Sequence, residues 1–192
     1  MRDTRLPDPI LLDETTGQSV NTLSLGSVKL YAAPPMARYV LQARTQALHN
    51  AAAILGLKAP ETMRVSSHKD RHLLWQGPYE WLLLDLPANS QEIETALADA
   101  LSGHAFSMVD ASHRNQGLLL TGKDVERLLA TGCMLDLSLD QFPVGMTTRT
   151  LFAKTDLTLW RIDAHTFHIE IGRSFVPYLI GLLQEGAKAL PA

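Results

Sequence analysis

The feature that most constrains the fold of this chain is an order of secondary structure that occurs twice. In the first copy, residues 38–43 are typical of a strand, and Thr45 is suited to cap the helix that follows. That helix carries an apolar stripe at helical spacing and ends at Gly56. Strands are expected at 62–67, 71–76 and 80–86, and a second helix, with Asn89 and Glu92 in a capping arrangement, ends at Gly103.

The second copy repeats this order. Strands are expected at 105–110 and 115–121, and a short helix with a capping-box-like start at Thr121 ends at Gly132. Further strands are expected at 146–153, 156–162 and 165–171, and a last helix begins at Ser174. In the strand at 165–171, apolar and polar residues alternate, which places Phe167, Ile169 and Ile171 on one face and Thr166, His168 and Glu170 on the other.

Strands that follow strands outnumber alternations of strand and helix, which favours antiparallel pairing. We therefore predict an α+β fold of two tandem units, each with the order strand, helix, three strands, helix. The pseudo-repeats cover about 38–103 and 104–186 of a single globular domain at 29–192, and residues 81–84 take the place of 167–170. A chain of 192 residues buries about 70% of its surface on folding, enough for one core or two small units.

Residues 1–28 differ from the rest of the chain. Pro7, Pro9 and Gly17 are mixed with Ser, Thr and scattered apolar residues, without a sustained helical or strand period. The stretch is too apolar for a solvated tail. We expect an extended N-terminal arm that docks on a surface of this chain or of a partner.

Composition excludes several classes of function. The 17 Lys and Arg residues against 20 Asp and Glu residues give a net charge of −3, and the densest basic stretch, 68–72, is interrupted by Asp70, so nucleic-acid binding is not expected. Cys133 is the single cysteine, which excludes an internal disulfide and a multi-cysteine metal site. Neither an apolar run of membrane-spanning length nor a signal peptide is seen, so we expect a soluble cytoplasmic protein.

Two segments have the composition of catalytic motifs. Gly117 to Asp124 approaches the phosphate-binding P-loop, but Asp124 stands where a Ser or Thr hydroxyl would bind magnesium, so a strand entering a helix is the better interpretation. Asp110, Ser112 and His113 are the residue types of a catalytic triad. Neighbours in sequence seldom converge on one substrate, so we expect a strand end and a turn in which Asp110 and Ser112 accept backbone amides.

The remaining chemically active side chains also favour structural roles. His165 and His168 are three apart on a strand and point to opposite faces, and His68 and His72 have no third ligand, so surface histidines are expected. Cys133 follows a helix stop among apolar residues and is expected to be packed. The three tryptophans are expected to pack in the core or an interface. No catalytic, cofactor-binding or metal-binding residue is predicted.

A composite pattern over residues 38–186 is more specific. It consists of Gly77-Pro-Tyr-Glu-Trp-Leu82, Val109-Asp-Ala-Ser-His-Arg114, Leu120-Thr-Gly-Lys-Asp124, Gly132-Cys-Met-Leu-Asp-Leu137, Thr158-Leu-Trp-Arg161 and Phe167-His-Ile-Glu-Ile-Gly-Arg-Ser-Phe175. In this order and spacing, the elements resemble the gamma subunit family of heterotetrameric sarcosine oxidase. That family is similar to a shortened aminomethyltransferase folate-binding fold.

The resemblance implies a non-catalytic accessory subunit. Such a complex oxidises sarcosine to glycine, forms hydrogen peroxide and passes the methyl carbon to tetrahydrofolate. The flavins, the NAD and the folate are held by the other subunits, a large flavin- and folate-binding subunit and a flavin-binding oxidase subunit. The resemblance transfers no catalytic or cofactor-binding residue to this chain.

Two alternatives stay open at this point. A free-standing folate-binding one-carbon protein of the same fold would hold a pterin against an aromatic side chain, with Asp110 or Glu80 on the ring nitrogens. A hydrolase would use Cys133 as a nucleophile or His68 and His72 as metal ligands.

Overall fold

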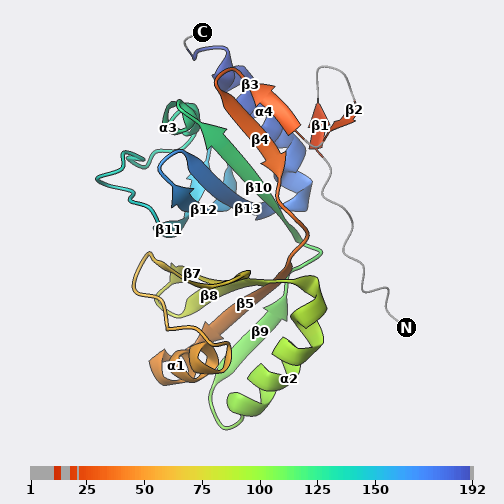
Figure 1. The fold of residues 1–192 in the computed structure, drawn as a ribbon, viewed down its shortest axis with the longest axis vertical. Helices are drawn as coiled ribbons and strands as arrows, with labels where there is room; N and C mark the ends of the chain where they lie inside the picture. The colour runs from red at the N-terminus through yellow and green to blue at the C-terminus, as the bar shows by residue number, and fades with distance from the viewer. Residues whose placement is uncertain (1–10, 14–17, 21, 191–192) are drawn as a thin grey trace. The chain divides into compact units, whose positions relative to one another are not determined.

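The computed structural model describes residues 11–13, 18–20 and 22–190 (Figure 1). Its internal contacts divide the chain into two compact units. The first unit contains residues 35–113, and the second contains the segment that ends at residue 34 together with everything from residue 114 onward. The chain therefore leaves the second unit after residue 34 and returns to it at residue 114.

The first unit is a five-stranded antiparallel sheet with two helices. Its strands are β5 (Ala37–Ala43), β6 (Val65–His68), β7 (Arg71–Gly77), β8 (Glu80–Asp85) and β9 (Phe106–Asp110), in the order β6-β7-β8-β5-β9. Helix α1 (Thr45–Ile54) follows β5, and helix α2 (Ser90–Ala100) follows β8 through a 3₁₀ turn at Pro87–Asn89. Both helices lie on the same side of the sheet (Figure 1).

Period-two alternation in the strands and helical spacing in α1 and α2 build one apolar core in this unit. The sheet contributes Tyr39, Leu41, Leu73, Trp81 and Leu83, α1 contributes Ala47, Leu48, Ala51 and Ala52, and α2 contributes Ile93 and Leu97. The small alanines of α1 allow the helix backbone to approach the sheet closely.

The second unit is a six-stranded antiparallel sheet in the order β11-β12-β13-β10-β4-β3. The strands are β3 (Thr22–Leu25), β4 (Val28–Ala32), β10 (Asn115–Gly122), β11 (Thr147–Phe152), β12 (Thr155–Asp163) and β13 (Thr166–Gly172). Helix α3 (Val125–Leu129) follows β10, and helix α4 (Val176–Ala187) follows β13 through a 3₁₀ turn at Arg173–Phe175. A separate pair, β1 (Leu11–Asp13) and β2 (Gln18–Val20), is antiparallel.

The core of the second unit lies between its sheet and the helices α3 and α4. Apolar residues alternate along each central strand, and the helices close the core from the same side. Its members include Leu118, Leu120, Leu157, Leu159, Phe167, Ile169 and Ile171 from the strands and Val125, Leu128, Leu129, Leu179, Ile180 and Leu183 from the helices.

The predicted α+β fold of two tandem antiparallel units is confirmed. The series β5, α1, β6, β7, β8, α2 and the series β10, α3, β11, β12, β13, α4 have the same order along the chain and the same strand order within their sheets. One boundary differs: β9 pairs with β5 in the first sheet, whereas the sequence assigns 105–110 to the second repeat. Strand β4 takes the corresponding place beside β10.

In the N-terminal arm, the structure departs further from the prediction than it does at the repeat boundary. Residues 22–25 and 28–32 form a hairpin, β3–β4, that extends the second sheet through β10, whereas the arm was expected to continue to residue 28. The turn places Gly26 at a φ of +64°, a conformation that favours glycine. Leu23, Leu25, Val28 and Leu30 are all buried. Residues 1–10, 14–17 and 21 of the predicted arm lie outside the described residues.

The predicted side-chain caps are wrong. No helix of the described chain has a side-chain hydrogen bond at its N-cap, and the caps expected from the sequence were Thr45, Asn89, Thr121 and Ser174. The 3₁₀ turn before α4 shifts its N-cap from Ser174 to Phe175, whereas Asn89 stands at the N-cap of α2 but in a helical backbone conformation. The Asn89 amide instead donates to Asp85 Oδ1 (2.7 Å), and the Asp124 carboxylate accepts a bond from another hairpin.

Candidate functional site

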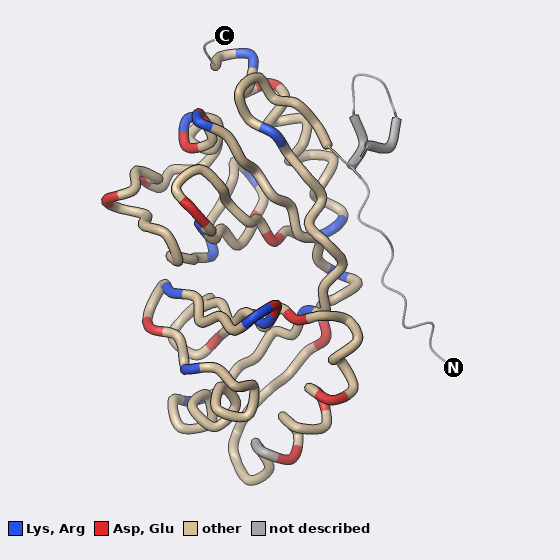
Figure 2. Tube along the Cα trace, viewed as in Figure 1, with Lys and Arg blue, Asp and Glu red and all other residues tan. Residues whose placement is uncertain are grey.

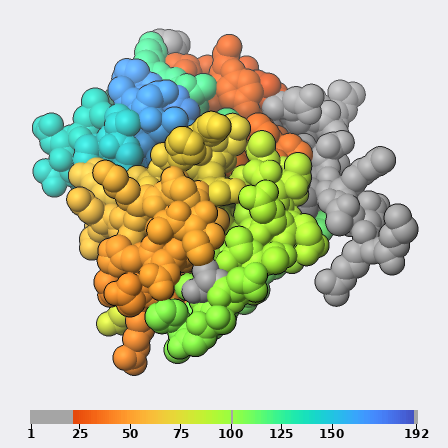
Figure 3. All heavy atoms as spheres, turned by 60° about the horizontal axis from the view of Figure 1, so that its bottom comes forward, coloured from red at the N-terminus to blue at the C-terminus, as the bar shows by residue number. Residues whose placement is uncertain are grey.

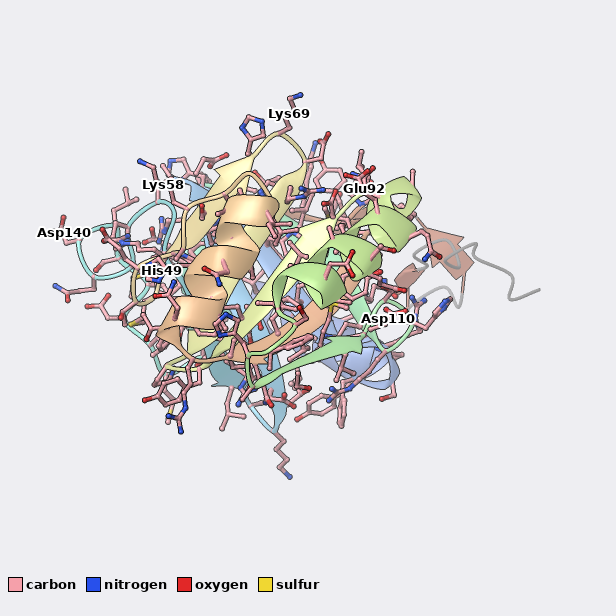
Figure 4. All side chains as sticks on the ribbon, turned by 90° about the horizontal axis from the view of Figure 1, so that it is seen from below. His49, Lys58, Lys69, Glu92, Asp110 and Asp140 are labelled. Carbon is pink, nitrogen blue, oxygen red and sulfur yellow. The ribbon has the colours of Figure 1, made fainter. Side chains whose placement is uncertain are left out.

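The segment with triad residue types is a structural turn at the end of β9 (Figure 4). The Ser112 backbone N–H donates to Asp110 Oδ1 (2.8 Å), and the Arg38 backbone N–H donates to Ser112 Oγ (2.9 Å). Both side chains accept backbone amides, as predicted. They fasten the end of β9 to β5, and Ser112 is buried, so its hydroxyl is not presented as a nucleophile.

The P-loop-like segment is a strand that enters a helix, as predicted: β10 runs to Gly122, and α3 begins at Val125. Asp124 Oδ2 accepts a hydrogen bond from the Ser27 hydroxyl at 2.5 Å. This bond holds the pKa of the Asp124 carboxyl below its usual range, aided by the charges of Lys123 and Arg127. The carboxylate joins the β3–β4 turn to the start of α3. Its negative charge would repel a phosphate group at this position.

The histidines at 68 and 72 do not face one another. In the β6–β7 hairpin, His68 pairs with Arg71 and His72 pairs with Ser67, so the two imidazoles leave opposite faces of the strands. His72 Nδ1 is hydrogen-bonded to Ser67 Oγ (2.8 Å). Within the described part of the chain, no group of three or more metal-ligating side chains occurs.

His168 is the exception to the expectation of surface histidines. It is buried on β13, and its Nε2 lies 2.7 Å from Oε1 of Glu170, which is also buried. The two polar residues share a face, as the alternation predicts, because they are two apart on one strand. Trp160, opposite His168 on β12, packs a tilted ring against the imidazole with centroids 5.7 Å apart. The alternation gave no sign that this polar face is buried.

The carboxylates considered for pterin binding are not brought together. Glu80 pairs with Gln42 near one end of β5, whereas Asp110 pairs with Tyr39 near the other end. Glu80 accepts a bond from the Gln42 amide (3.3 Å), and Asp110 is engaged with Ser112. Trp81, next to Glu80, is buried in the core. Glu80 and Asp110 therefore lie near opposite ends of β5, and each is already hydrogen-bonded within the chain.

Cys133 and the tryptophans have the packing roles that the sequence predicts. Cys133 is a buried free thiol 4.0 Å from the Thr150 hydroxyl. Trp81 and Trp160 are buried, and Trp75 packs against the core of the first unit. A buried thiol among apolar neighbours is not activated as a nucleophile.

Tyr39 is a buried titratable group in the core of the first unit. Its hydroxyl donates to Glu94 Oε1 (2.9 Å), which joins β5 to α2, and burial raises the pKa of the phenol to about 12. The Ser90 hydroxyl opposes that rise, and the Glu94 carboxylate adds to it.

The raised pKa of Tyr39 predicts how the stability of the fold depends on pH. A folded-state pKa above the ordinary value of 10.0 stabilises the fold below pH 10, and that stabilisation is lost as the pH rises toward 12. In a spectrophotometric tyrosine titration of the native protein, one ionisation near pH 12 is expected, and it is absent from Tyr39→Phe. An identical titration curve for the variant contradicts this assignment.

Sequence reasoning missed the loop between α3 and β11, residues 130–146. Arg161 on β12 is fully buried and anchors it: one guanidinium nitrogen donates to Glu126 Oε1 (2.8 Å) and to the Leu137 carbonyl, and another donates to the Ala164 carbonyl (2.7 Å). The guanidinium lies over the Phe167 ring, 4.4 Å from its centroid. The alternation along β12 could have flagged an Arg at a core position.

The described residues do not gather into a set of nucleophile, base and orienting acid, and the polar groups above bond to backbone or to one another. The acidic and basic residues are spread over both units (Figure 2). An open groove beside Arg71 is lined by His68, Lys69, Asp70 and Asp85, but Asp85 pairs with Arg71 and neutralises it. None of the helices described here is long and apolar enough to cross a membrane.

Comparison with known proteins gives a family and a structural relative. A chain of heterotetrameric sarcosine oxidase from Corynebacterium sp. U-96 matches with 26% identity and a TM-score of 0.75, over 90% of this chain and 92% of that one. Aminomethyltransferase T of the glycine cleavage system from Bartonella henselae shares the fold, with 15% identity and a TM-score of 0.58, over 80% of this chain and 44% of the other.

A comparison with curated protein sequences gave no match. The family model described as "Sarcosine oxidase, gamma subunit family" matches residues 41–189. This range contains every element of the composite motif, together with the loop that Arg161 anchors. The chain belongs to the sarcosine oxidase gamma subunit family.

Proposed function

We propose that this chain is the accessory gamma subunit of a heterotetrameric sarcosine oxidase. The observation that carries the proposal is the match over nearly the full length of both chains to one chain of such a complex. The packing and turn-forming roles of Asp110, Ser112, Asp124 and Cys133 support an accessory part in it. The chain supplies a folded surface to the complex rather than a reacting group.

In this proposal, the flavins, the NAD and the tetrahydrofolate that accepts the methyl carbon are bound by the larger subunits. The complex works in the cytoplasm. This chain binds none of these groups, and its part is to complete the assembly in which the larger subunits act.

Co-expression tests the proposal. The full chain with an affinity tag is expressed with the larger flavin-bearing subunits of a sarcosine oxidase from the same organism. We expect the tag to retain all subunits in fixed proportion, in a complex that forms hydrogen peroxide from sarcosine. The proposal fails if the larger subunits assemble an oxidase of equal activity while this chain elutes alone at 21.1 kDa.

A further inference from the structure

Strand β9 forms one edge of the sheet in the first unit (Figure 4). It pairs with β5 on one side, up to the Ala111 N–H that donates to the Arg38 carbonyl (2.8 Å), and no described strand pairs with its other side. The helices α1 (orange) and α2 (green) lie side by side and cover one face of this sheet (Figure 3). The edge strand, by contrast, keeps main-chain groups to which another strand could bond.

The main chain of β9 presents half of its hydrogen-bonding groups outward. In an antiparallel pair, successive residues point their N–H and C=O groups alternately toward the partner strand and away from it. The bond between β5 and the residue after β9 sets the phase: the groups of Ser107 and Val109 point toward β5, and those of Phe106 and Met108 point outward. The outer side of β9 is thus a row of donors and acceptors at the spacing of a strand.

The side chains of β9 also alternate between the two faces of the sheet. Phe106 and Met108 pack against the core on the helix side, whereas Ser107 and Val109 lie on the other face, where Val109 is 55% exposed. Because the packed side chains hold the strand in place, the outward row of main-chain groups is ordered before a partner arrives. This order lowers the entropy cost of binding.

The sequence of β9 lacks the features that keep sheet edges from pairing. Residues 88–113 contain no Lys, Arg or Pro, the pairing with β5 has no bulge, and the charge on β9, Asp110, stands at its last position. The other edges described here differ: β11 contains Arg149 and precedes Lys154, β6 precedes Lys69, and β3 contacts β1. Soluble proteins protect their edges by such charges or covers, so β9 is the edge suited to accept a strand.

A groove lies at the start of β9, on the face of the sheet without helices. Its lining includes Gln42, Arg44, Tyr79, Glu80, Phe106 and Ser107. Gln42 pairs with Ser107 on one side and with Glu80 on the other, so the groove crosses three neighbouring strands. Arg44 and Glu80 give it both signs of charge, and the Tyr79 ring, 63% exposed, favours a large apolar side chain. A strand added to β9 would place every second side chain on this face, beside the groove.

The N-terminal segment of this chain is a poor match for the β9 edge. Three of its first five residues are charged, which suits neither the exposed Val109 nor the groove. Pro7 and Pro9 have no N–H to donate to a neighbouring strand. Residues 1–10 are therefore not the strand that this edge selects.

A second copy of the chain also fits the edge poorly. If two β9 strands paired about a twofold axis with full overlap, Met108 would face its own copy and Asp110 of each chain would lie opposite Phe106 of the other. Each carboxylate would then be desolvated beside an aromatic ring without a cation on the strand, which costs free energy twice. The groove would receive no large apolar side chain, because Ser107 would lie opposite Val109.

We propose that β9 is a docking edge that accepts an extended segment of a larger subunit of the oxidase complex. The segment adds a strand to the first sheet and inserts a large apolar side chain beside Tyr79. Its main-chain hydrogen bonds to the edge supply affinity, and the alternation of its side chains sets the register. The inference rests on the proposed function and names the way in which this chain holds its partner.

The first test uses the co-expressed full complex and two variants of the tagged chain. Val109→Lys places a protective charge on the edge and is expected to weaken binding to the larger subunits about tenfold or more. Leu151→Lys on β11 is the matched control, because Leu151 is also 55% exposed and also lies on an edge strand, and it is expected to bind as the parent does. Parental binding by Val109→Lys, or an equal loss for both variants, overturns the inference.

Hydrogen exchange followed by mass spectrometry needs no substitution and covers the case in which a variant fails to fold. In the free chain, the outward amides of Phe106 and Met108 are expected to exchange faster than those of Ser107 and Val109, which bond to β5. Assembly is expected to slow the outward amides about tenfold or more, since they acquire partners in the added strand.

Each other result of the exchange experiment counts against a particular step. Unchanged exchange at Phe106 and Met108 in the assembled complex overturns the inference and leaves the proposed function standing. Slow exchange of these amides in the free chain overturns the choice of partner: it indicates a segment of the same chain if it is independent of concentration, and a second copy if it appears as the concentration rises. Absence of any complex with the parent chain overturns the proposed function itself.

Discussion

Replacement of Gly122 by Ala is expected to destabilise the second unit by about 4 kcal/mol, a sum of backbone strain and overpacking. Gly122 has a φ of +149°, a backbone conformation that residues with a Cβ atom rarely adopt. A Cβ built there lies 2.2 Å from the Ser27 carbonyl oxygen and 2.8 Å from the Val28 Cα. Both are backbone atoms of the hairpin that pairs with β10, so relief of the clash requires the strands to part.

The hairpin itself offers a matched control. Gly26 also has a positive φ, of +64°, but an added Cβ there meets no atom within 4 Å. Gly26→Ala isolates the cost of the backbone conformation, about 1 kcal/mol. Thermal unfolding followed by circular dichroism is the measurement, and for a chain of this size Gly122→Ala is expected to lower the midpoint by about 10 °C. Equal midpoints for the two variants would show that the approach of Ser27 is not what requires glycine at 122.

The elements that could be predicted from the sequence are those in which local pattern and tertiary packing agree. The alternation at 166–171 and the apolar stripe at 48–55 each describe a face that is buried against its own unit. The turn at 110–112 was also predictable, because an Asp two residues before a Ser satisfies backbone amides locally. The repeat followed from these elements, since its order is a property of the chain alone.

The β3–β4 hairpin was not predicted, although its sequence carries the pattern of two short strands and a turn. Leu23 and Leu25 alternate with polar residues, as do Val28 and Leu30, and Gly26-Ser27 between them is a turn sequence. The prolines and serines earlier in the segment dominated its composition and hid this short period. The helix caps failed for a different reason: the Asn89 amide donates to Asp85, four residues earlier, and the Asp124 carboxylate accepts a bond from Ser27, which is far away in the sequence.

The candidate site was predictable only in part. Motif search indicated that Asp110, Ser112 and Cys133 have structural roles, and their contacts agree with this. The burial of His168 and Glu170 was not predictable, because polar residues in a strand are assigned to the exposed face by default. Arg161 continues the alternation of Leu157 and Leu159, but no local pattern contains the partners of its guanidinium. The anchoring of the α3–β11 loop depends on Arg161, so it could not be recognised before the position of that guanidinium was known.

Replacement of Arg161 by Met is expected to destabilise the second unit by about 3 kcal/mol and to release the α3–β11 loop. The variant keeps the apolar volume over Phe167 but leaves the Leu137 carbonyl without the bond that ties the loop to β12. Glu126 loses its cation, and since its side chain is 35% exposed, water replaces part of that interaction, which places the cost at the lower end for a broken buried pair. Arg161→Lys is the matched variant.

Lysine keeps the charge, but its single ammonium cannot reproduce the planar fork of donors that reaches Glu126, Leu137 and Ala164 together, so an intermediate loss is expected. Urea denaturation measures the stability of all three proteins, and hydrogen exchange of the amides at 133–146 measures release of the loop. Faster exchange confined to the rest of the second unit, with the loop amides unchanged, would show that the core residues Cys133, Leu137 and Phe142 hold the loop without Arg161.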